Sequence, residues 1–288
     1  MFGFINVYKP VGMTSHDVVS KLRRLLQFKH IGHGGTLDPF AEGVLPVFLG
    51  NASKLADYLS DGKEYIALLQ FGAETDTYDC TGKITINYDN KVLIGDLEKV
   101  LKKFKGEIEQ IPPMYSAIKL NGKKLYEYAR KGQVVDIPKR KVVINEIELL
   151  KFDENKQTCK IRVSCSKGTY IRSLAKDIGN ALGNGAYLLT LQRTVSGPFD
   201  IKNTISFNDI EFTTVNKHII NPIEVLTQYK HIVLSEKECK DIGFGRNIKR
   251  RVEDVVDGYV MLLKDDTLVS IGKVENDEIH PMKVLVND

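Results

Sequence analysis

The chain has 288 residues, of which 42% are hydrophobic and 27% charged, and this is the composition of an ordinary globular protein. Its length allows one large domain and a small one, and it contains neither a low-complexity tract nor an apolar run long enough to span a membrane. The net charge of +4 is modest, so a polyanionic partner must be met by a local basic patch rather than by the whole surface.

The cysteines give no sign of a metal site or of a disulfide framework. They form no C-x-x-C pair and have no companion histidines at metal-ligand spacing: Cys80, Cys159, Cys165 and Cys239. The N-terminal residues FGFINVYKP also lack the basic and apolar regions of a signal peptide. We therefore expect reduced thiols in a cytoplasmic protein without a bound metal.

The first predicted elements are a strand at FGFINVYKP and an amphipathic helix over residues 14–28. Thr14 or Ser15 suits the N-cap, because a hydroxyl there can accept a bond from a backbone N–H group of the first turn. Apolar residues then recur at helical spacing: Val18, Val19, Leu22, Leu25 and Leu26.

The segment from His33 to Pro46, HGGTLDPFAEGVLP, predicts a rigid loop that presents Asp38. Pro39 fixes its own φ and pushes Asp38 toward an extended conformation. The surrounding glycines allow the backbone to approach something large. Asp38 is therefore either a turn residue that caps its own backbone or a chemical reagent, and composition alone leaves both interpretations open.

Beyond this loop, the pattern predicts a mixture of helices and strands. We expect helices at 52–59 and 96–104, and strands at 63–72, 83–88, 141–152 and 159–166. Long connections separate them, which is typical of an α+β domain rather than of repeated βαβ units. On residue type alone, Tyr65 is a strand aromatic that packs in the core.

A further helix is predicted in SKGTYIRSLAKDIGNALG. Its apolar face consists of Ile171, Leu174, Ala175, Ile178 and Leu182. Arg172 lies at the start of this helix, where a lone arginine is usually a solvated surface charge. An arginine can also hold a carboxylate with two donors and stays protonated when it does so.

The segment from Met114 to Lys141 is basic and contains interleaved tyrosines. The residues we single out as candidate RNA contacts are Lys119, Lys123, Lys124, Arg130 and Lys131. Basic side chains with aromatics suit phosphate contacts and stacking on unpaired bases. The alternative is a solvated amphipathic helix, which is the usual structure of such a charge run.

The C-terminal part of the chain reads as a separate unit. The pattern loosens from about Phe207 to Gln228, and short strands with polar turns follow from Tyr229 onward. A unit of about 60 residues is near the lower limit for independent folding. We therefore predict a boundary that divides the chain into 1–228 and a small mostly-β unit at 229–288.

Several of these motifs resemble one known family. GTLDPFAEGVLP resembles the catalytic signature of the TruB family of tRNA pseudouridine synthases. Four other segments, KP at Lys9, TDTYDCTG, SAIKLNGKKLYEYAR and SKGTYIR, are similar to further segments of that family in the same order. The resemblance implies a pseudouridine synthase catalytic domain with a mixed or antiparallel sheet, and the unit at 229–288 resembles a PUA RNA-binding domain.

The resemblance also implies roles for particular residues. Asp38 takes the place of the catalytic aspartate, and Arg172 that of the arginine that pairs with it. Tyr65 matches the tyrosine that stacks on the flipped base and is a candidate for proton removal, while His33 is placed against the RNA near the position that the base leaves. Tyr170 and Leu191 match residues that line the substrate pocket. Tyr65, Tyr170 and Leu191 each also have a packing interpretation, while the alternative for His33 is a metal site with His30, which is weak because a third ligand is missing.

The reaction implied is the conversion of uridine to pseudouridine at tRNA position 55, in the T-loop. The base must be flipped out, detached from ribose C1′ at N1 and rejoined at C5. This isomerisation is redox-neutral, so we expect no cofactor, and a carboxylate can act at the sugar by covalent catalysis. We expect the tRNA T-arm as partner, no guide RNA or protein partner, no membrane, and a monomer.

Two other functions are compatible with these residues. The protein would be a tRNA folding chaperone if binding were its main activity and catalysis secondary. It would be a hydrolytic enzyme if the lone aspartate acted at a sugar and free uracil were released.

Overall fold

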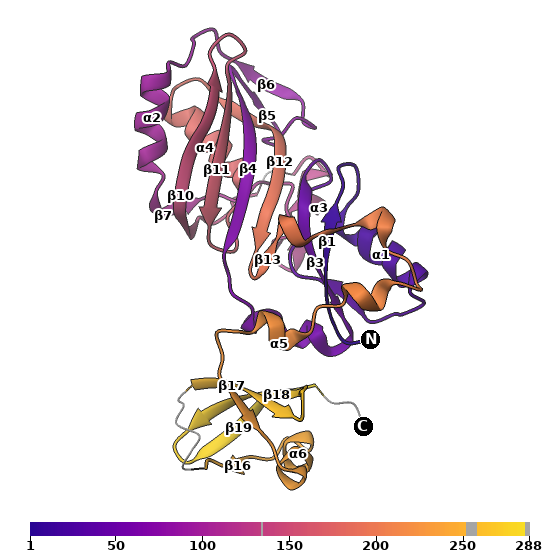
Figure 1. The fold of residues 1–288 in the computed structure, drawn as a ribbon. Coiled ribbons are helices and arrows are strands. Elements are labelled where there is room, and N and C mark those ends of the chain that lie inside the picture. Colours follow the sequence, from indigo (N-terminus) through magenta and orange to yellow (C-terminus); the bar gives the residue numbers. More distant parts are fainter. Residues whose placement is uncertain (134, 252–257, 286–288) are drawn as a thin grey trace.

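The computed structural model describes residues 1–133, 135–251 and 258–285, and contains two main sheets (Figure 1). The larger sheet has ten strands, and its main path runs in the order β14-β1-β3-β12-β4-β11-β10-β7. The strands of this path are β14 (Ile205–Ser206), β1 (Gly3–Lys9), β3 (Glu42–Leu49), β12 (Ala186–Ser196), β4 (Lys63–Phe71), β11 (Thr158–Cys165), β10 (Arg140–Asp153) and β7 (Gly106–Gln110). β2 (Ile31–His33) pairs with β3, and β13 (Phe199–Asp200) pairs with β12. The sheet is mixed, as predicted.

Strand β12 joins the two halves of the large sheet. It runs antiparallel to β4 and parallel to β3, with Arg193 opposite Gly43. A Cβ atom at Gly43 would lie 2.3 Å from the backbone oxygen of Arg193, so only glycine allows the strands to approach here. The sequence patterns did not predict β12, and β3 begins inside the segment 33–46 that we expected to be a loop.

Helices α2 (Ile94–Lys103) and α4 (Ile171–Ala181) cover one face of the half of the sheet formed by β4, β11, β10 and β7 (Figure 1). Alternate residues of β4, among them Ala67 and Leu69, are buried against Leu97 of α2 and Leu174 of α4. This is the packing expected of a strand with one buried face. The segments that carry Asp38 and Arg172 lie at the end of this core, where α4 begins.

Helix α1 (Ser15–Leu25) packs against β1 and β3 at the other half of the sheet. Thr14 is its N-cap and forms a capping box with Asp17, so one of the two predicted caps is correct. The helix predicted at 52–59 is a 3₁₀ segment, η1 (Gly50–Tyr58), that starts two residues earlier. The left-handed φ of +60° at Gly50 marks the point where the chain leaves β3.

The remaining short elements lie in the connections. They are β5 (Ala73–Thr75), β6 (Ile84–Asn87), β8 (Lys119–Leu120), β9 (Lys123–Lys124), α3 (Leu125–Ala129), η2 (Ile201–Asn203), η3 (Phe207–Asp209), η4 (Val215–His218) and α5 (Pro222–Val225). β5 pairs with β6, and β8 pairs with β9. Along the described parts of the chain, no helix is both long enough and apolar enough to cross a membrane.

The second sheet lies after α5 and has the strand order β15-β17-β18-β19-β16. Its elements are β15 (His231–Val233), α6 (Glu236–Gly243), β16 (Ile248–Lys249), β17 (Gly258–Lys264), β18 (Thr267–Glu275) and β19 (Glu278–Val284). Apolar residues of this unit, such as Met261 and Leu268, belong to one buried cluster with Phe4, Val44 and Phe48 of the large sheet. The two units therefore share part of a core.

Candidate functional site

The loop between β2 and β3 holds Asp38 in a tight turn. The backbone N–H of Ala41 donates to the Asp38 oxygen at 3.1 Å, which closes a four-residue turn with Pro39 in its second position. The N–H of Leu37 donates to Ser15 Oγ at 2.8 Å, and the N–H of Gly12 donates to the Pro39 oxygen at 2.8 Å. The first residue of α1 and the segment before it thus fix the loop on both sides of Asp38.

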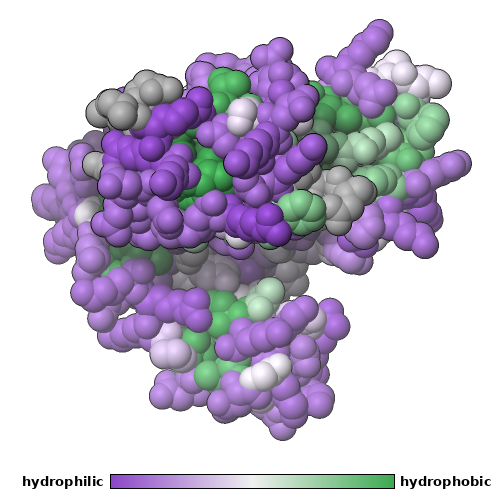
Figure 2. All heavy atoms as spheres, turned by 90° about the horizontal axis from the view of Figure 1, so that it is seen from below, coloured by the Kyte–Doolittle hydropathy of each residue, from purple (hydrophilic) through white to green (hydrophobic). Residues whose placement is uncertain are grey.

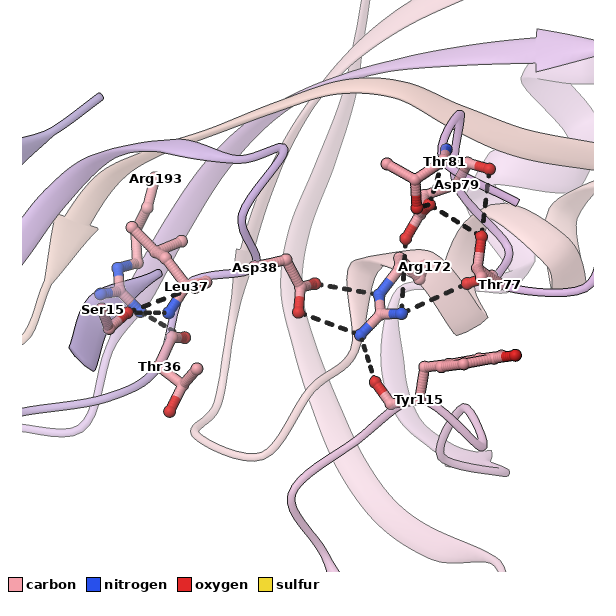
Figure 3. A network of polar contacts seen from close by, with 10 residues as sticks. All are labelled: Ser15, Thr36, Leu37, Asp38, Thr77, Asp79, Thr81, Tyr115, Arg172 and Arg193. Atoms are coloured by element: carbon pink, nitrogen blue, oxygen red, sulfur yellow. Dashed lines mark hydrogen bonds and ion pairs between the residues drawn. The ribbon is translucent and has the colours of Figure 1, made fainter. Parts of the chain in front are cut away.

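Asp38 forms a two-point ion pair with Arg172 (Figure 3). Arg172 Nε lies 2.9 Å from Asp38 Oδ2, and Arg172 Nη2 donates to Asp38 Oδ1 at 3.1 Å. The Arg172 side chain is 5% exposed and that of Asp38 is 32% exposed, so the carboxylate is the member of the pair that reaches open space. The structure therefore brings together the two residues that the sequence singled out.

Three further groups hold the Arg172 guanidinium in place. Its Nη1 donates to the Thr77 oxygen at 3.3 Å and to Asp79 Oδ2 at 3.4 Å, and its Nη2 donates to the Tyr115 oxygen at 2.9 Å (Figure 3). A buried charge needs such partners, because its desolvation is otherwise unfavourable by several kcal/mol. Arg172 thus connects the Asp38 loop to the segments around Asp79 and Tyr115.

Asp79 is itself fixed by its own turn. Its Oδ1 accepts bonds from Thr77 Oγ1 at 2.8 Å, from the Thr81 N–H at 3.0 Å and from Thr81 Oγ1 at 2.5 Å. The segment TDTYDCTG, residues 75–82, forms this turn, with the Thr75 hydroxyl donating to the Asp79 oxygen at 2.9 Å. Its contact with Arg172 was missed, and no local signal marks which of the polar residues in TDTYDCTG reaches the site.

The start of α4 is anchored to the end of β7. The Tyr170 N–H donates to Gln110 Oε1 at 3.1 Å, and Gln110 Nε2 donates back to the Tyr170 oxygen at 3.3 Å. Ser173 Oγ also donates to the Ile111 oxygen at 2.7 Å. These bonds position Arg172 in the first turn of α4, close to the point where the basic segment 114–141 begins.

A cavity of about 420 Å³ opens in front of Asp38 and Arg172. This size lies within the range of about 300–1,000 Å³ that small-molecule sites occupy. Tyr65, Tyr170 and Leu191 all line it, so three more predicted site residues share this cavity. The basic segment contributes Tyr115, Ser116, Ala117 and Tyr126 to the same wall.

Burial dominates the acid–base properties of the site. It raises the pKa of the Asp38 carboxyl, and the adjacent Arg172 opposes this rise. Burial also raises the pKa of the Tyr65 phenol, which keeps the hydroxyl neutral, while the nearby Arg193 guanidinium acts in the opposite direction. Lys9, at the end of β1, is fully buried, and burial lowers the pKa of its ammonium to about 8.

Arg193 is a buried cation of the site that the sequence patterns did not reveal. Its side chain is 0% exposed although it lies in the middle of β12. The guanidinium donates to three backbone oxygens: those of Val44 at 2.8 Å, Gly35 at 3.1 Å and Thr36 at 3.5 Å. Arg193 therefore holds the loop that carries Asp38 through the backbone oxygens of Gly35 and Thr36. A signal that could have found it is that Arg193 is the single charged residue of the stretch AYLLTLQRTVS.

His33 does not line the Asp38 cavity. It lines a second cavity of about 250 Å³, together with Pro46, Phe48 and Phe199. Lys63, the first residue of β4, lines both cavities. Burial lowers the pKa of His33, which favours its neutral form. The structure therefore places His33 beside the site but apart from the Asp38–Arg172 pair.

The basic segment forms a small hairpin of β8 and β9 followed by α3. Lys119, Lys123, Arg130 and Lys131 are exposed, and Lys124 is partly buried. The Lys124 and Arg130 cations lie 5.5 Å and 5.3 Å from the centre of the Tyr126 ring. The structure thus brings this basic surface to the rim of the Asp38 cavity, through Tyr126.

The face of the molecule in Figure 2 is mostly hydrophilic, and hydrophobic residues show there only in small separate areas. Large continuous apolar areas usually mark docking sites for proteins or membranes. Among the residues that carry a colour, hydrophilic residues surround and divide the hydrophobic areas of this face.

Sequence comparison relates this chain to proteins with an assigned activity. The profile described as "TruB family pseudouridylate synthase (N terminal domain)" matches residues 23–171, and that of the "tRNA pseudouridylate synthase B C-terminal domain" matches residues 172–227. The tRNA pseudouridine synthase B of Clostridium tetani is 42% identical over 99% of this chain and 100% of the relative. That of Staphylococcus haemolyticus is 44% identical over 98% of each chain.

Solved structures give a similar result. A crystal structure of a Cbf5–Nop10–Gar1 complex contains a chain that is similar to this one with a TM-score of 0.72 and 28% identity. The similarity covers 99% of this chain and 85% of that chain. An H/ACA ribonucleoprotein bound to a substrate RNA containing 2′-deoxyuridine gives a TM-score of 0.71 at 27% identity, over 99% and 86% of the two chains.

Proposed function

Since this chain belongs to the TruB family of pseudouridylate synthases, we propose that it converts the T-loop uridine at tRNA position 55 into pseudouridine. It is a tRNA pseudouridine synthase, as its curated relatives are, and the resemblance seen in its motifs is confirmed. The choice of the T-loop position is our proposal. The observation that carries the proposed catalysis is the two-point ion pair of Asp38 and Arg172 at the wall of a cavity of about 420 Å³.

The proposed chemistry assigns a distinct part to each residue of the pair. Asp38 acts at the sugar, as nucleophile or as stabiliser of positive charge, while the C1′–N1 bond breaks and the C1′–C5 bond forms. The C5 proton then leaves, and N1 gains a proton. Arg172 orients the Asp38 carboxylate and supports its charged form against the effect of burial.

The flipped base needs a surface on which to stack. Tyr65 supplies an aromatic ring in the cavity, and its hydroxyl is a candidate for the proton transfer at C5. Tyr170 and Leu191 form further walls of the cavity. His33 lies in the adjacent cavity, where it can occupy the position that the base leaves.

The remaining parts of the chain bind the RNA in this proposal. The cations of the basic segment, Lys119, Lys123, Lys124, Arg130 and Lys131, contact phosphates of the T-arm. We assign 1–228 to catalysis and 229–288 to a PUA-like unit that contacts RNA. The protein acts in the cytoplasm as a monomer, without a guide RNA or protein partner. It recognises its tRNA mainly through phosphates and the shape of the loop.

The proposed function is tested with the purified protein and an unmodified tRNA transcript. We expect one pseudouridine at the T-loop position, which position-specific chemical mapping detects, and none when Asp38→Asn replaces the wild type. A transcript that carries cytidine at this position serves as the matched substrate control. Binding without modification would instead indicate a tRNA chaperone, and release of free uracil would indicate a hydrolase.

A further inference from the structure

Lys63 is a partly buried cation without an acidic partner in the described residues. It lies at the start of β4, two residues before Tyr65, and lines both the Asp38 cavity and the neighbouring cavity of His33. Its ammonium forms neither an ion pair nor a hydrogen bond with any residue that the structure describes. The nearby Asp61 is already paired with Lys167, at 3.1 Å.

A second cation lies close to the Lys63 ammonium. A Cβ atom built on Gly35 would lie 3.4 Å from Lys63 Nζ and 3.6 Å from Arg193 Nη1, so both cationic groups approach the same point. The hydrogen bonds of Arg193 go to the backbone oxygens of Val44, Gly35 and Thr36, and it forms no ion pair with a described carboxylate, so its charge is not neutralised. Burial and the charge of Arg193 both lower the pKa of Lys63.

The two cationic groups repel each other because they are close together and partly buried. An anion bound between or beside them would offset this unfavourable electrostatic energy. Gly35 has no side chain, so the point that both cationic groups approach is not filled by this residue. Lys63 itself lines both cavities. A nucleotide whose base occupies the Asp38 cavity is joined to the next nucleotide of the RNA by a phosphodiester.

We propose that Lys63, with the charge of Arg193 behind it, binds a phosphodiester of the RNA that flanks the flipped uridine. This inference rests on the proposed function and adds a contact to it. Lys63 is a substrate-positioning residue here: it holds the backbone of the target nucleotide so that the sugar faces Asp38. Arg193 has two roles. It supports the loop at Gly35 and Thr36, and it strengthens the positive potential at Lys63.

The first test measures the salt dependence of RNA binding for Lys63→Met. A T-arm stem-loop RNA is the probe, and its dissociation constant is measured from low to moderate salt. We expect affinity to fall about tenfold, and the slope of log K against log salt to fall by about 0.7–0.9, which corresponds to one lost phosphate contact. Lys63→Arg should recover most of both values. A merely structural role would lower the melting temperature without changing the slope.

Lys167→Met is the matched control for this measurement. Lys167 also lies close to Asp61, but its charge is already paired and its side chain is 66% exposed. We expect this substitution to leave both the slope and the affinity near wild type. An equal loss of slope in Lys167→Met and Lys63→Met would contradict a specific phosphate contact at Lys63.

A second test identifies the phosphate. Stem-loops with one neutral methylphosphonate linkage, on the 5′ or the 3′ side of the target uridine, are bound to the wild type and to Lys63→Met. At one of the two positions, the neutral linkage should weaken binding to the wild type about tenfold and to the variant hardly at all. The inference is wrong if the two effects simply multiply at both positions.

The two proposals fail in different ways. A wild-type protein that forms no pseudouridine in the stem-loop or in full tRNA would overturn the proposed function. A wild type that forms pseudouridine, with an unchanged salt slope in Lys63→Met, would overturn only the phosphate contact.

Discussion

Asp38 and Asp79 bind the same guanidinium, but only Asp38 reaches the cavity. Asp38 Oδ2 lies 2.9 Å from Arg172 Nε, and Asp79 Oδ2 lies 3.4 Å from Arg172 Nη1. The Asp79 side chain is 4% exposed, against 32% for Asp38. Arg172 is thus held by the fixed carboxylate of Asp79 and by the Thr77 and Tyr115 oxygens, while its Nε and Nη2 contact the carboxylate that faces the cavity.

Replacement of Asp38 by asparagine should remove the chemistry and leave binding intact. The amide keeps the shape of the side chain, but it is neither a nucleophile nor an anion. We expect single-turnover pseudouridine formation to fall by roughly 10⁴-fold or more. Filter binding should give a dissociation constant for tRNA within about threefold of wild type. Residual activity within a hundredfold of wild type would show that another group does the chemistry.

Asp79→Asn tests the support behind Arg172. The amide can still accept a bond from the guanidinium, but the charge that strengthens this bond is lost. We expect the single-turnover rate to fall about 10- to 100-fold, with little change in the dissociation constant.

Asp76→Asn is the control for this change. Asp76 belongs to the same turn, where its Oδ1 accepts a bond from the Lys83 N–H at 2.8 Å. The structure gives Asp76 no contact with Arg172, so its replacement should leave the rate near wild type. Equal losses in the two variants would mean that the turn as a whole, rather than Asp79, supports the site.

The pH dependence of the rate should report the Asp38 carboxyl. Burial raises its pKa above the usual value of 3.8, and the charge of Asp79 adds to that rise. Because the ionised form is active, kcat/KM should fall as the pH drops through this raised pKa. In Asp79→Asn, a source of the rise is gone, so the acid limb should move to lower pH. Circular dichroism checks that the fold persists over the range, and a limb that stays in place or moves upward would contradict the assignment.

Tyr65→Phe separates stacking from proton transfer. Tyr65 is only 6% exposed, and burial raises the pKa of its phenol, so the hydroxyl is neutral at working pH. The phenyl ring keeps the stacking surface and loses only the hydroxyl. If this hydroxyl takes part in the proton transfer, kcat should fall about 10²- to 10⁴-fold while KM stays similar.

Tyr58→Phe is the control for Tyr65→Phe. Tyr58 is buried between the two units, where its ring contacts those of Tyr229 and Tyr259, and it lines neither of the cavities near Asp38. Its replacement should leave kcat unchanged. A kcat near wild type in Tyr65→Phe as well would limit Tyr65 to stacking.

The lysines of the basic segment 114–141 offer a comparison within one part of the chain. Lys123 and Lys131 are exposed, and the structure gives neither an ion pair with a described residue. Lys139 and Lys141 are paired, with Glu109 at 3.3 Å and with Glu107 at 2.8 Å. We expect Lys123→Met with Lys131→Met to reduce the slope of log K against log salt by about 1.4–1.8.

The matched double variant, Lys139→Met with Lys141→Met, should change this slope little. Its glutamates would lose their partners at an exposed surface, where such pairs contribute only about 0–1 kcal/mol. The basic segment is not the RNA contact if the two double variants behave alike.

Local patterns predicted the elements that have a clear period or cap. Thr14 is the N-cap of α1, and the apolar face of α4 begins at Ile171 as its spacing indicates. The α+β class and a mixed sheet followed from the same reasoning and from the family resemblance. These features depend on residues that are close in sequence, so a linear pattern contains them.

Long-range pairing explains what the sequence did not predict. β12 contains the fully buried Arg193, and a pattern that places charges at the surface cannot recognise such a strand. Asp79 meets Arg172 across 93 residues, and Arg193 meets the oxygens of Gly35 and Val44 across about 150. Only the assembled sheet brings these groups together.

The apolar cluster shared by the two units has a mechanical consequence. Phe48 and Val44 of β3 pack with Met261 and Leu268 of the C-terminal sheet, and Lys54 Nζ donates to the Val284 oxygen at 3.0 Å. If the C-terminal unit were connected only by a flexible linker, a force on it would extend the linker and would not reach the large sheet. Here the C-terminal sheet is packed directly on β3. A force on the C-terminal sheet is therefore transmitted to β3, which begins four residues after Asp38.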